Sequence, residues 1–313
     1  ESFHYSPAPI FHVAGMLYPL ATIARGGTSL VLTEFNPDQV LRWMQSGRLT
    51  GCFLVPTMIS TLLQHPQVAD SDYAALESIA YGGAPMSPAL LRRAMSVFDC
   101  EFMNMFGAGT EAGMQTILTP EDHRRALDGR EHLLGSVGKP GIGIDLKIVD
   151  DDMNVVPRGT VGEIVTRSDA VMVGYLDQPE LTAEVLVDGW FRGGDLAWQD
   201  EDGYIYLSGR KKDMIIRGGE NIYPIEIEAV LSELPEVLEA AVIGVPDEHW
   251  GEVVHAYVVL RPGASFDATV ASEFCRERLA AYKVPASFEV VDALPRNASG
   301  KILKRELRAL HQR

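Results

Sequence analysis

Apolar runs of strand length alternate with segments of helical spacing in the first third of the chain. Strands are expected at 28–33, 51–56, 76–83 and 101–107, and helices at 35–47, 57–64 and 85–98. One helix start is well marked, because Asn36 is a good N-cap and Pro37 suits the first helical position. Strands that alternate with helices are typical of a mostly parallel, doubly wound sheet, so we predict an α/β fold here.

The pattern changes twice further along the chain. Residues 135–209 contain short apolar–polar alternations separated by Gly, Asp and Pro, which predicts an all-β unit, either a small β-barrel or a distorted sheet. A third pattern follows and predicts a compact α+β unit. Its expected elements are a helix that starts at Pro224, strands at 237–245, 253–260 and 287–291, and a helix at 267–281.

We therefore expect two domains, with a boundary at 209–213, where a glycine meets a charge cluster. Residues 1–209 are predicted to be the later part of a large N-terminal domain, and residues 210–313 a small C-terminal lid domain. The chain opens on Glu1 rather than Met and enters an apolar segment almost at once, so we expect an N-terminally truncated fragment.

Composition narrows the class of protein. A length of 313 residues is enough for about two domains, and 46% hydrophobic with 22% charged residues is ordinary for globular proteins. The net charge of −16 has the wrong sign for nucleic-acid binding. No apolar run approaches the ~18 residues of a transmembrane segment, so none is expected.

The three cysteines, Cys52, Cys100 and Cys275, are far apart and odd in number. They allow no disulfide framework and no CxxC metal site, which indicates a reducing, cytoplasmic setting. The sequence leaves the oligomeric state open, a homodimer included.

Two glycine-rich segments follow predicted strands, namely residues 82–84 (GGA) and 107–111 (GAGTE). In parallel sheets, ligands collect at the carboxyl ends of the strands. Thr110 and Glu111 place a hydroxyl and a carboxylate side by side, which suits a phosphate and its Mg²⁺. Taken singly, each segment is equally compatible with a simple tight turn.

Further candidates lie near the predicted domain boundary. Asp195 follows two glycines, and its carboxylate could accept both hydroxyls of a ribose or cap a turn. Arg210 and Lys212 could bind an anion or be solvated charges, and the glycines of 218–221 could form a plain hairpin. His12, taken alone, is better explained as a core histidine.

The order and spacing of these segments carry more information than any one of them. They are FHVAG (11–15), YGGA (81–84), GAGTE (107–111), GSVGKPGIG (135–143), GWFRGGD (189–195), GRKKDMIIRGGENIYPIEIE (209–228) and PRNASGKILKREL (295–307). Together they resemble the acyl-adenylate-forming (AMP-binding) superfamily of acyl-CoA synthetases, luciferases and peptide-synthetase adenylation domains. The resemblance runs from about residue 9 to 307, and the last two segments are its most specific parts.

The resemblance implies a set of site residues. The implied catalytic residues are Lys301, Glu111, Thr110 and His12, with Glu111 as the Mg²⁺ ligand. The implied nucleotide-binding residues are Gly82, Gly83, Ala84, Met105, Phe106, Gly107, Asp195 and Arg210. By the same resemblance, Lys301 bridges the α-phosphate and the acyl carboxylate, Thr110 contacts phosphate, and Asp195 accepts the ribose hydroxyls with help from Arg210.

The resemblance also implies a moving domain. Lys212 matches a hinge at which the small domain rotates, which removes Lys301 from the active site. The same rotation would bring in Gly218, Gly219 and Glu220, where small side chains let the pantetheine arm of coenzyme A pass close to the main chain.

The sequence departs from the family pattern in two places. The Ser/Thr/Gly-rich phosphate loop expected upstream of residues 11–15 is not in this sequence, so we expect little or no ATP chemistry from this chain alone. The run from Phe106 to Glu111 has one residue more than the usual aromatic-Gly-x-Thr-Glu, so the backbone on the adenine side is expected to bulge.

The implied function is ligation of a carboxylic acid, fatty or aromatic, to coenzyme A, with ATP and Mg²⁺ and through an acyl-AMP intermediate. The segments 218–228 and 295–307 look closest to those of members that use coenzyme A with such acids. Two alternatives stay open: an adenylation unit that loads a carrier protein, and a non-catalytic nucleotide-binding remnant.

Overall fold

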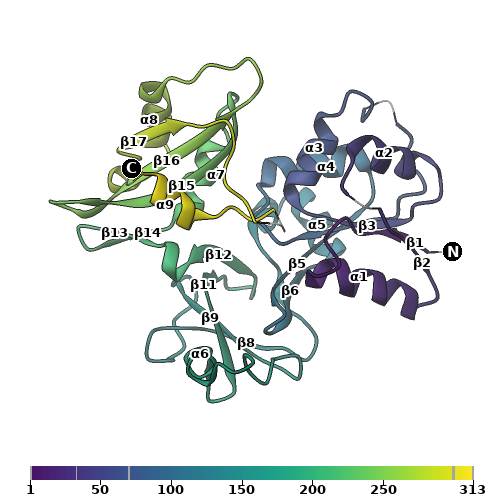
Figure 1. Ribbon diagram of the computed structural model, residues 1–313, viewed down its shortest axis with the longest axis horizontal. Helices are drawn as coiled ribbons and strands as arrows, with labels where there is room; N and C mark the ends of the chain where they lie inside the picture. Colours follow the sequence, from purple (N-terminus) through teal and green to yellow (C-terminus); the bar gives the residue numbers. More distant parts are fainter. Residues whose placement is uncertain (1, 33, 70, 298–299, 312–313) are drawn as a thin grey trace.

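The computed structural model describes residues 2–32, 34–69, 71–297 and 300–311, and it contains three sheets (Figure 1). The first sheet has the strands β1 (Phe3–Tyr5), β2 (Thr28–Leu30), β3 (Gly51–Leu54), β4 (Ser78–Gly82), β5 (Glu101–Gly109), β6 (Gly113–Leu118) and β7 (Lys139–Pro140). Its helices are α1 (Val13–Ala24), α2 (Pro37–Gln45), α3 (Pro56–Gln64), α4 (Pro88–Phe98), α5 (Pro120–Leu127) and the short 3₁₀ helix η1 (Glu131–Gly135).

The strand order of this sheet is β2-β1-β3-β4-β5-β6-β7, and β1 to β5 are parallel whereas β6 and β7 are antiparallel. This confirms the predicted, mostly parallel α/β sheet. All four residues of β3 are buried. Helix α2 begins where predicted, because Asn36 Oδ1 accepts a hydrogen bond of 3.0 Å from Gln39 N, and its buried face packs into the core.

Helix α1 is an element that the apolar pattern did not predict. Its sequence, VAGMLYPLATIA, is apolar on every side, so no amphipathic period marks it. Leu17, Leu20 and Ile23 are 51–58% exposed on its outer side. The mixed stretch at 10–32 therefore contains a helix whose apolar surface is only partly covered by the described residues.

The second sheet is antiparallel and contains β8 (Asp145–Val149), β9 (Gly162–Arg167), β10 (Leu186–Val187), β11 (Trp190–Gln199) and β12 (Ile205–Arg210). Register shifts within β11 distort it, in agreement with the predicted distorted sheet. The all-β prediction was wrong at one point, because helix α6 (Pro179–Val185) precedes β10. None of its residues is buried, so its sequence has no periodic apolar pattern that would have predicted a helix.

The third sheet forms the predicted α+β unit. Its strands are β13 (Ile215–Arg217), β14 (Glu220–Ile222), β15 (Val237–Asp247), β16 (Gly251–Leu260) and β17 (Ser287–Val290). Its helices are α7 (Pro224–Leu231), α8 (Ala268–Arg276), α9 (Lys304–His311) and the 3₁₀ helices η2 (Lys211–Asp213) and η3 (Ala281–Lys283). Helix α8 ends five residues before the predicted end, at a turn in which Leu279 N donates to Cys275 O.

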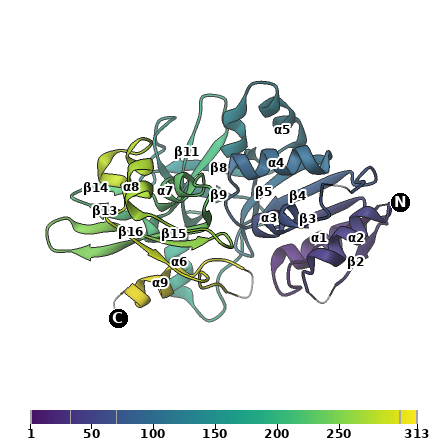
Figure 2. The same ribbon diagram turned by 90° about the horizontal axis from the view of Figure 1, so that it is seen from above.

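The segment between β17 and α9 leaves the third sheet and extends toward the first sheet. Both views show this yellow segment running into the region between the sheets (Figures 1 and 2). None of the helices in the described part of the chain is long and apolar enough to cross a membrane.

The hairpin of β11 and β12 joins the second sheet to the first. Backbone hydrogen bonds of 2.9 Å connect Ile205 with Val137 and Gly138, next to β7. At the hairpin tip, the Tyr204 hydroxyl donates to Asp122 of α5 over 2.5 Å. Asp122 also completes a capping box, because it accepts from Thr119 N over 3.0 Å while its own N–H donates to the Thr119 hydroxyl.

Asp122 should make stability depend on pH. Burial opposes its ionisation, but the hydrogen bonds from Thr119 and Tyr204 outweigh burial and lower the pKa of this carboxyl below its ordinary value. A lowered pKa contributes stability that is complete above the ordinary carboxyl pKa and is lost as the pH falls through the folded value. We expect Asp122→Asn to lower the free energy of unfolding by about 1–3 kcal/mol at pH 7.

The measurement is urea unfolding of both proteins between pH 7 and pH 3. The difference in the free energy of unfolding between Asp122→Asn and the unaltered chain should shrink as the pH falls below about 4. The exposed Asp128, which follows the same helix, supplies the control: Asp128→Asn should change stability by no more than about 0.5 kcal/mol. A difference for Asp122→Asn that is constant with pH would contradict the role given to its charge.

Candidate active site

At the carboxyl end of β4, the backbone lies so close to β5 that it leaves no room for a side chain. Gly82 pairs with Met105 of β5, and a Cβ atom on Gly82 would lie 2.2 Å from the Met105 carbonyl oxygen. Gly83 continues the chain at φ +80°, a conformation that glycine adopts freely. The residues 82–84 and 105–107 are therefore neighbours at the carboxyl ends of β4 and β5.

The end of β5 is irregular. Its register against β6 shifts twice: Gln115 of β6 has no partner between Phe106 and Gly107, and Ala108 of β5 has none between Gly107 and Gly109. Gly109 has φ +65°, which lets the chain turn toward Thr110. The bulge predicted from the additional residue is confirmed.

Glu111 stands in the turn between β5 and β6 with a donor on each carboxylate oxygen. Thr110 donates to Oε2 over 2.9 Å, and the Tyr175 hydroxyl donates to Oε1 over 3.2 Å. Burial, followed by the nearby Glu111 charge, raises the pKa of Tyr175, so its phenol stays protonated and able to donate. The backbone of Glu111 is also held, because its carbonyl accepts from Met172 N over 2.8 Å.

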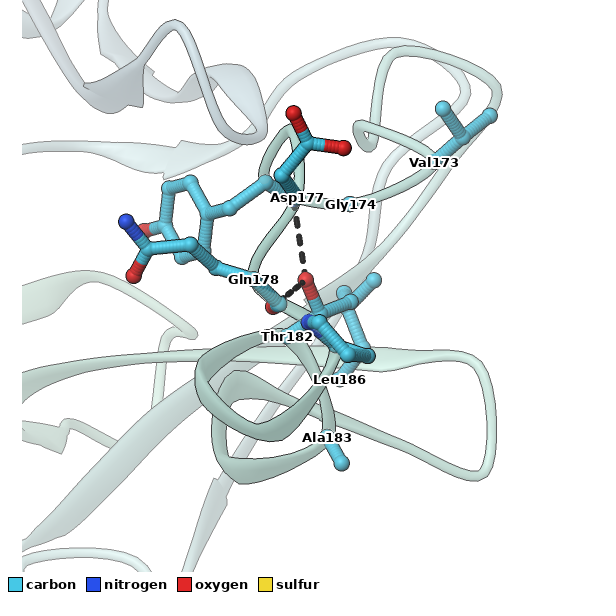
Figure 3. Close-up of a pocket in the computed structure, with 9 residues that line it drawn as sticks. Val173, Gly174, Asp177, Gln178, Thr182, Ala183 and Leu186 are labelled. Atoms are coloured by element: carbon cyan, nitrogen blue, oxygen red, sulfur yellow. Dashed lines mark hydrogen bonds between the residues drawn. The ribbon is translucent and has the colours of Figure 1, made fainter.

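Tyr175 was not among the residues predicted from the sequence. It lines a hollow of about 410 Å³ beside α6 (Figure 3). Within it, the hydroxyl of Thr182 accepts from Tyr175 N over 2.9 Å and donates to Gln178 O over 2.8 Å. These bonds tie α6 to the segment that positions the Tyr175 ring beside Glu111.

His12 caps the helix that lies against this turn. Its Nδ1 accepts a hydrogen bond of 3.3 Å from Ala14 N, which makes His12 the N-cap of α1. His12 is only half-buried, so it is not a core histidine. The next residue, Val13, lies 3.3 Å from the Cβ position of Gly109, so the start of α1 lies against the end of β5.

Asp195 and Arg210 face each other across β11 and β12. They are direct partners in the antiparallel register, and Arg210 Nε lies 3.1 Å from Asp195 Oδ1. The Asp195 side chain is only 16% exposed. Burial raises the pKa of this carboxyl, and Arg210 and Lys301 oppose the rise. The pair is thus a partly desolvated carboxylate held by cations.

Glu163 of β9 supports this pair and was missed by the sequence reasoning. Its side chain is 7% exposed and accepts from Arg192 over 2.7 Å and from Gly194 N over 3.2 Å. Lys211 Nζ lies 3.7 Å away. Glu163 therefore fixes the two-glycine turn before Asp195. The only signal in the sequence was a carboxylate directly before the apolar pair Ile164 and Val165.

A second hollow, of about 320 Å³, opens beside Asp195. It is lined by Gly193, Gly194, Arg210, Lys211 and Lys212. This hollow is smaller than the one beside α6, but it coincides with the charged residues that the sequence singled out. Three cationic side chains around one small cavity favour an anionic ligand.

The loop between β17 and α9 brings Lys301 to this cluster. It is closed as a hairpin, because Asn297 Oδ1 accepts from Lys301 N over 2.9 Å and Lys301 O accepts from Asn297 N over 3.0 Å. Gly300 has φ +82° in this loop, and Ala298 and Ser299 lie outside the described residues. Loss of hydration and then the nearby Arg210 lower the pKa of Lys301, and Asp195 opposes them.

The segment 218–220 is not part of this cluster. It forms the exposed turn between β13 and β14, where Gly218 N donates to Trp250 O over 2.8 Å. In Figure 1 these two strands lie on the side of the third sheet that faces away from the first sheet. Lys301 and Asp195 are thus close enough to influence each other's ionisation, whereas Gly218, Gly219 and Glu220 lie in a separate, exposed turn.

The comparisons with known proteins agree with these observations. The AMP-binding enzyme family matches residues 2–176, and the AMP-binding enzyme C-terminal domain matches residues 226–301. The chain belongs to the AMP-binding enzyme family. This confirms the resemblance found in the sequence.

Relatives of known function differ in the acceptor that their names state. The chain is 42% identical over 302 residues to a feruloyl-CoA synthase of an Amycolatopsis species, covering 96% of this chain and 60% of the relative. It is 40% identical over 300 residues to the fatty acid–[acyl-carrier-protein] ligase ScoC of Streptomyces coeruleorubidus, covering 96% and 57%.

A solved structure of the amide bond synthetase McbA from Marinactinospora thermotolerans superposes with a TM-score of 0.91 at 38% identity. The match covers 99% of this chain and 62% of McbA. It confirms the fold class. The chain spans about three-fifths of the length of these AMP-binding enzymes.

A substitution at Gly82 tests how tightly the backbones of β4 and β5 pack against each other. Gly82→Ala places a methyl group on the Met105 carbonyl, which cannot move without parting β4 from β5. We expect a loss of about 1–3 kcal/mol in the free energy of unfolding, measured in urea. Gly135→Ala is the matched control, because no atom of the described residues lies within 4 Å of its Cβ position, and it should be neutral or stabilising by up to about 1 kcal/mol. Equal stability of both variants would show that the two strands pack loosely there.

Proposed function

We propose that this chain forms the later part of an AMP-forming acid–thiol ligase, with ATP and a carboxylic acid as its first substrates. The observation that carries the proposal is the approach of Lys301 to Asp195 and Arg210 at a cation-lined hollow. Membership of the AMP-binding enzyme family supports acid activation as the chemistry.

The proposed first step makes an acyl-adenylate. A carboxylate oxygen of the acid attacks the α-phosphorus of ATP, the bond to the β-phosphate oxygen breaks, and pyrophosphate leaves. Such transfers depend on positioning and on neutralising charge on the phosphoryl oxygens. Lys301 is suited to bridge the α-phosphate and the acid carboxylate, because its ammonium lies at the same cluster as Arg210.

Asp195 is the proposed acceptor for the ribose hydroxyls. Its carboxylate is desolvated, it is anchored on one oxygen by Arg210, and Glu163 holds the turn before it. The residues 82–84 and 105–107 are proposed to line the adenine, since Gly83, Ala84 and Gly107 are exposed there and small residues let the backbone approach a flat ring closely.

Glu111 and Thr110 are proposed to hold Mg²⁺. The fit is good, because both offer oxygen atoms and, among the described residues, each oxygen of the Glu111 carboxylate accepts one hydrogen bond, from Thr110 or Tyr175. A bound Mg²⁺ would neutralise phosphate charge during the transfer. His12, at the N-cap of α1, is proposed to line the acid and phosphate side.

The proposed second step transfers the acyl group to a thiol. The sulfur attacks the acyl carbon, the carbon–oxygen bond to AMP breaks, and AMP leaves. The structure has Lys301 at the site and Gly218, Gly219 and Glu220 away from it, which suits the first step. Rotation at Lys212, the middle residue of η2, would exchange the two segments.

Coenzyme A is the proposed acceptor, and a fatty or aromatic acid the proposed substrate. The feruloyl-CoA synthase supports both proposals. A carrier protein is the second candidate for the acceptor, because ScoC is a fatty acid–[acyl-carrier-protein] ligase at 40% identity. The non-catalytic alternative is a remnant that binds nucleotide without turnover.

Lys301→Ala tests the first step. The assay is acid-dependent ATP–pyrophosphate exchange with fatty and aromatic acids, on this chain and on a chimaera that adds the remaining N-terminal part of the feruloyl-CoA synthase. We expect exchange in the chimaera to fall by about 10²-fold or more in Lys301→Ala, the loss typical of a removed charge-stabilising group. Lys147→Ala, an exposed lysine over Trp190, is the control and should keep full exchange.

Absence of exchange in the chimaera with every acid would favour the remnant without turnover. Exchange that survives Lys301→Ala would remove Lys301 from the mechanism. If the unextended chain catalysed exchange at the rate of the chimaera, it would contradict our expectation that this chain alone has little or no ATP chemistry.

Gly219→Val tests the second step separately. Gly219 has φ +89° in the turn between β13 and β14, and a branched side chain there would obstruct a thiol arm that passes the main chain. We expect thioester formation, measured with coenzyme A by mass spectrometry in the chimaera, to fall much more than exchange. Gly263→Val is the matched control, because Gly263 has φ +77° and equally open surroundings in the same unit. Equal losses in both variants would point to a folding defect instead.

A further inference from the structure

A group of metal-ligating side chains lies on the third sheet, apart from the candidate active site. His255 of β16, Glu289 of β17 and His311 of α9 offer one ligand atom each, and these atoms lie within 4.8 Å of one another. The two imidazole rings have centroids 4.4 Å apart. Residues from three elements thus converge at one point.

His255 is the informative member of the group. Its side chain is 4% exposed, and among the described residues its Nε2 has no hydrogen-bond partner. Glu289 Oε2 is the nearest charged acceptor, and at 3.8 Å it is beyond hydrogen-bond distance. A buried ring nitrogen without a partner is costly, unless something occupies the space that it faces.

The other nitrogen of this ring is fixed. Nδ1 lies 2.7 Å from the hydroxyl of Ser287, the first residue of β17. Histidine ligands of metals are held in the same way, with the second nitrogen donating to a neighbouring oxygen. Donation to Ser287 leaves a lone pair on Nε2, the nitrogen that faces Glu289 and His311.

We propose that His255, Glu289 and His311 form a binding site for a divalent transition-metal ion, with Zn²⁺ as the best match. Two imidazoles and one carboxylate are a ligand set that Zn²⁺ takes, with a fourth position left for water. Ligand atoms about 2.1 Å from a tetrahedral ion lie about 3.4 Å apart, so the present spacing needs only small side-chain rotations. The exposed Glu289 and His311 are free to make them.

The site would tie the last helix to the sheet. His311 ends α9, and the start of α9 follows the hairpin loop of Lys301 by three residues. Arg308 of the same helix pairs with Asp213 of η2 over 3.0 Å. An ion on His311 would therefore restrain the helix that links the lysine loop to the proposed hinge.

Isothermal titration of the 313-residue chain with Zn²⁺ tests the proposal. We expect one ion with a dissociation constant below about 10 µM. His311→Ala and Glu289→Gln, which change exposed side chains outside the core, should each weaken binding by at least about tenfold. Even the loss of a residue that only orients a ligand costs 10–100-fold. Ser287→Ala should weaken it within that range.

His249→Ala is the matched control, because His249 is an exposed histidine of the same unit that lies against Trp250. It should bind Zn²⁺ as the unaltered chain does. Zn²⁺ should also raise the melting temperature of the unaltered chain but not that of His311→Ala. No saturable binding below about 100 µM, or equal binding by His311→Ala and the unaltered chain, overturns the proposal.

Discussion

The antiparallel pairing of β11 with β12 is the contact on which the arrangement of the candidate site depends. The register of these strands sets Asp195 opposite Arg210. The same hairpin joins the first sheet through Ile205 and the Tyr204–Asp122 bond, and β12 runs directly into η2. One hairpin therefore fixes the carboxylate, its cation and the point where the third sheet begins, so that a slip of one residue would disturb all three.

The charges at this point are balanced by neighbours rather than by water. Asp195 is mostly buried, and its carboxyl has cations on two elements, Arg210 of β12 and Lys301 of the lysine loop. Glu163 balances Arg192 and lies near Lys211 in the same way. Because the carboxylates of Glu163 and Asp195 are only 7% and 16% exposed, their interactions with these cations are screened less by water than on an open surface. The charged Asp195 attracts the Lys301 ammonium, whereas loss of hydration and the nearby Arg210 oppose its approach.

The sequence predicted elements whose apolar pattern was regular and missed those without one. Helix α2 and strand β3 were found from local signals, whereas α1 is apolar on all sides and α6 buries nothing. The bulge at Ala108 followed from counting residues. Glu163 and Tyr175 act on partners 29 and 64 residues away, and such contacts leave no local pattern. The placement of Lys301 beside Asp195, across about a hundred residues, was expected only through the family resemblance.

The central claim is that Asp195 and Lys301 act on one nucleotide. A crystal structure of the chain, extended as in the chimaera, with a sulfamoyl analogue of an acyl-adenylate tests it most directly. The account predicts that both ribose hydroxyls lie within hydrogen-bond distance of the Asp195 carboxylate and that Lys301 Nζ contacts the sulfamoyl oxygens. An analogue bound elsewhere, or bound at Asp195 with Lys301 directed away from it, would contradict the account.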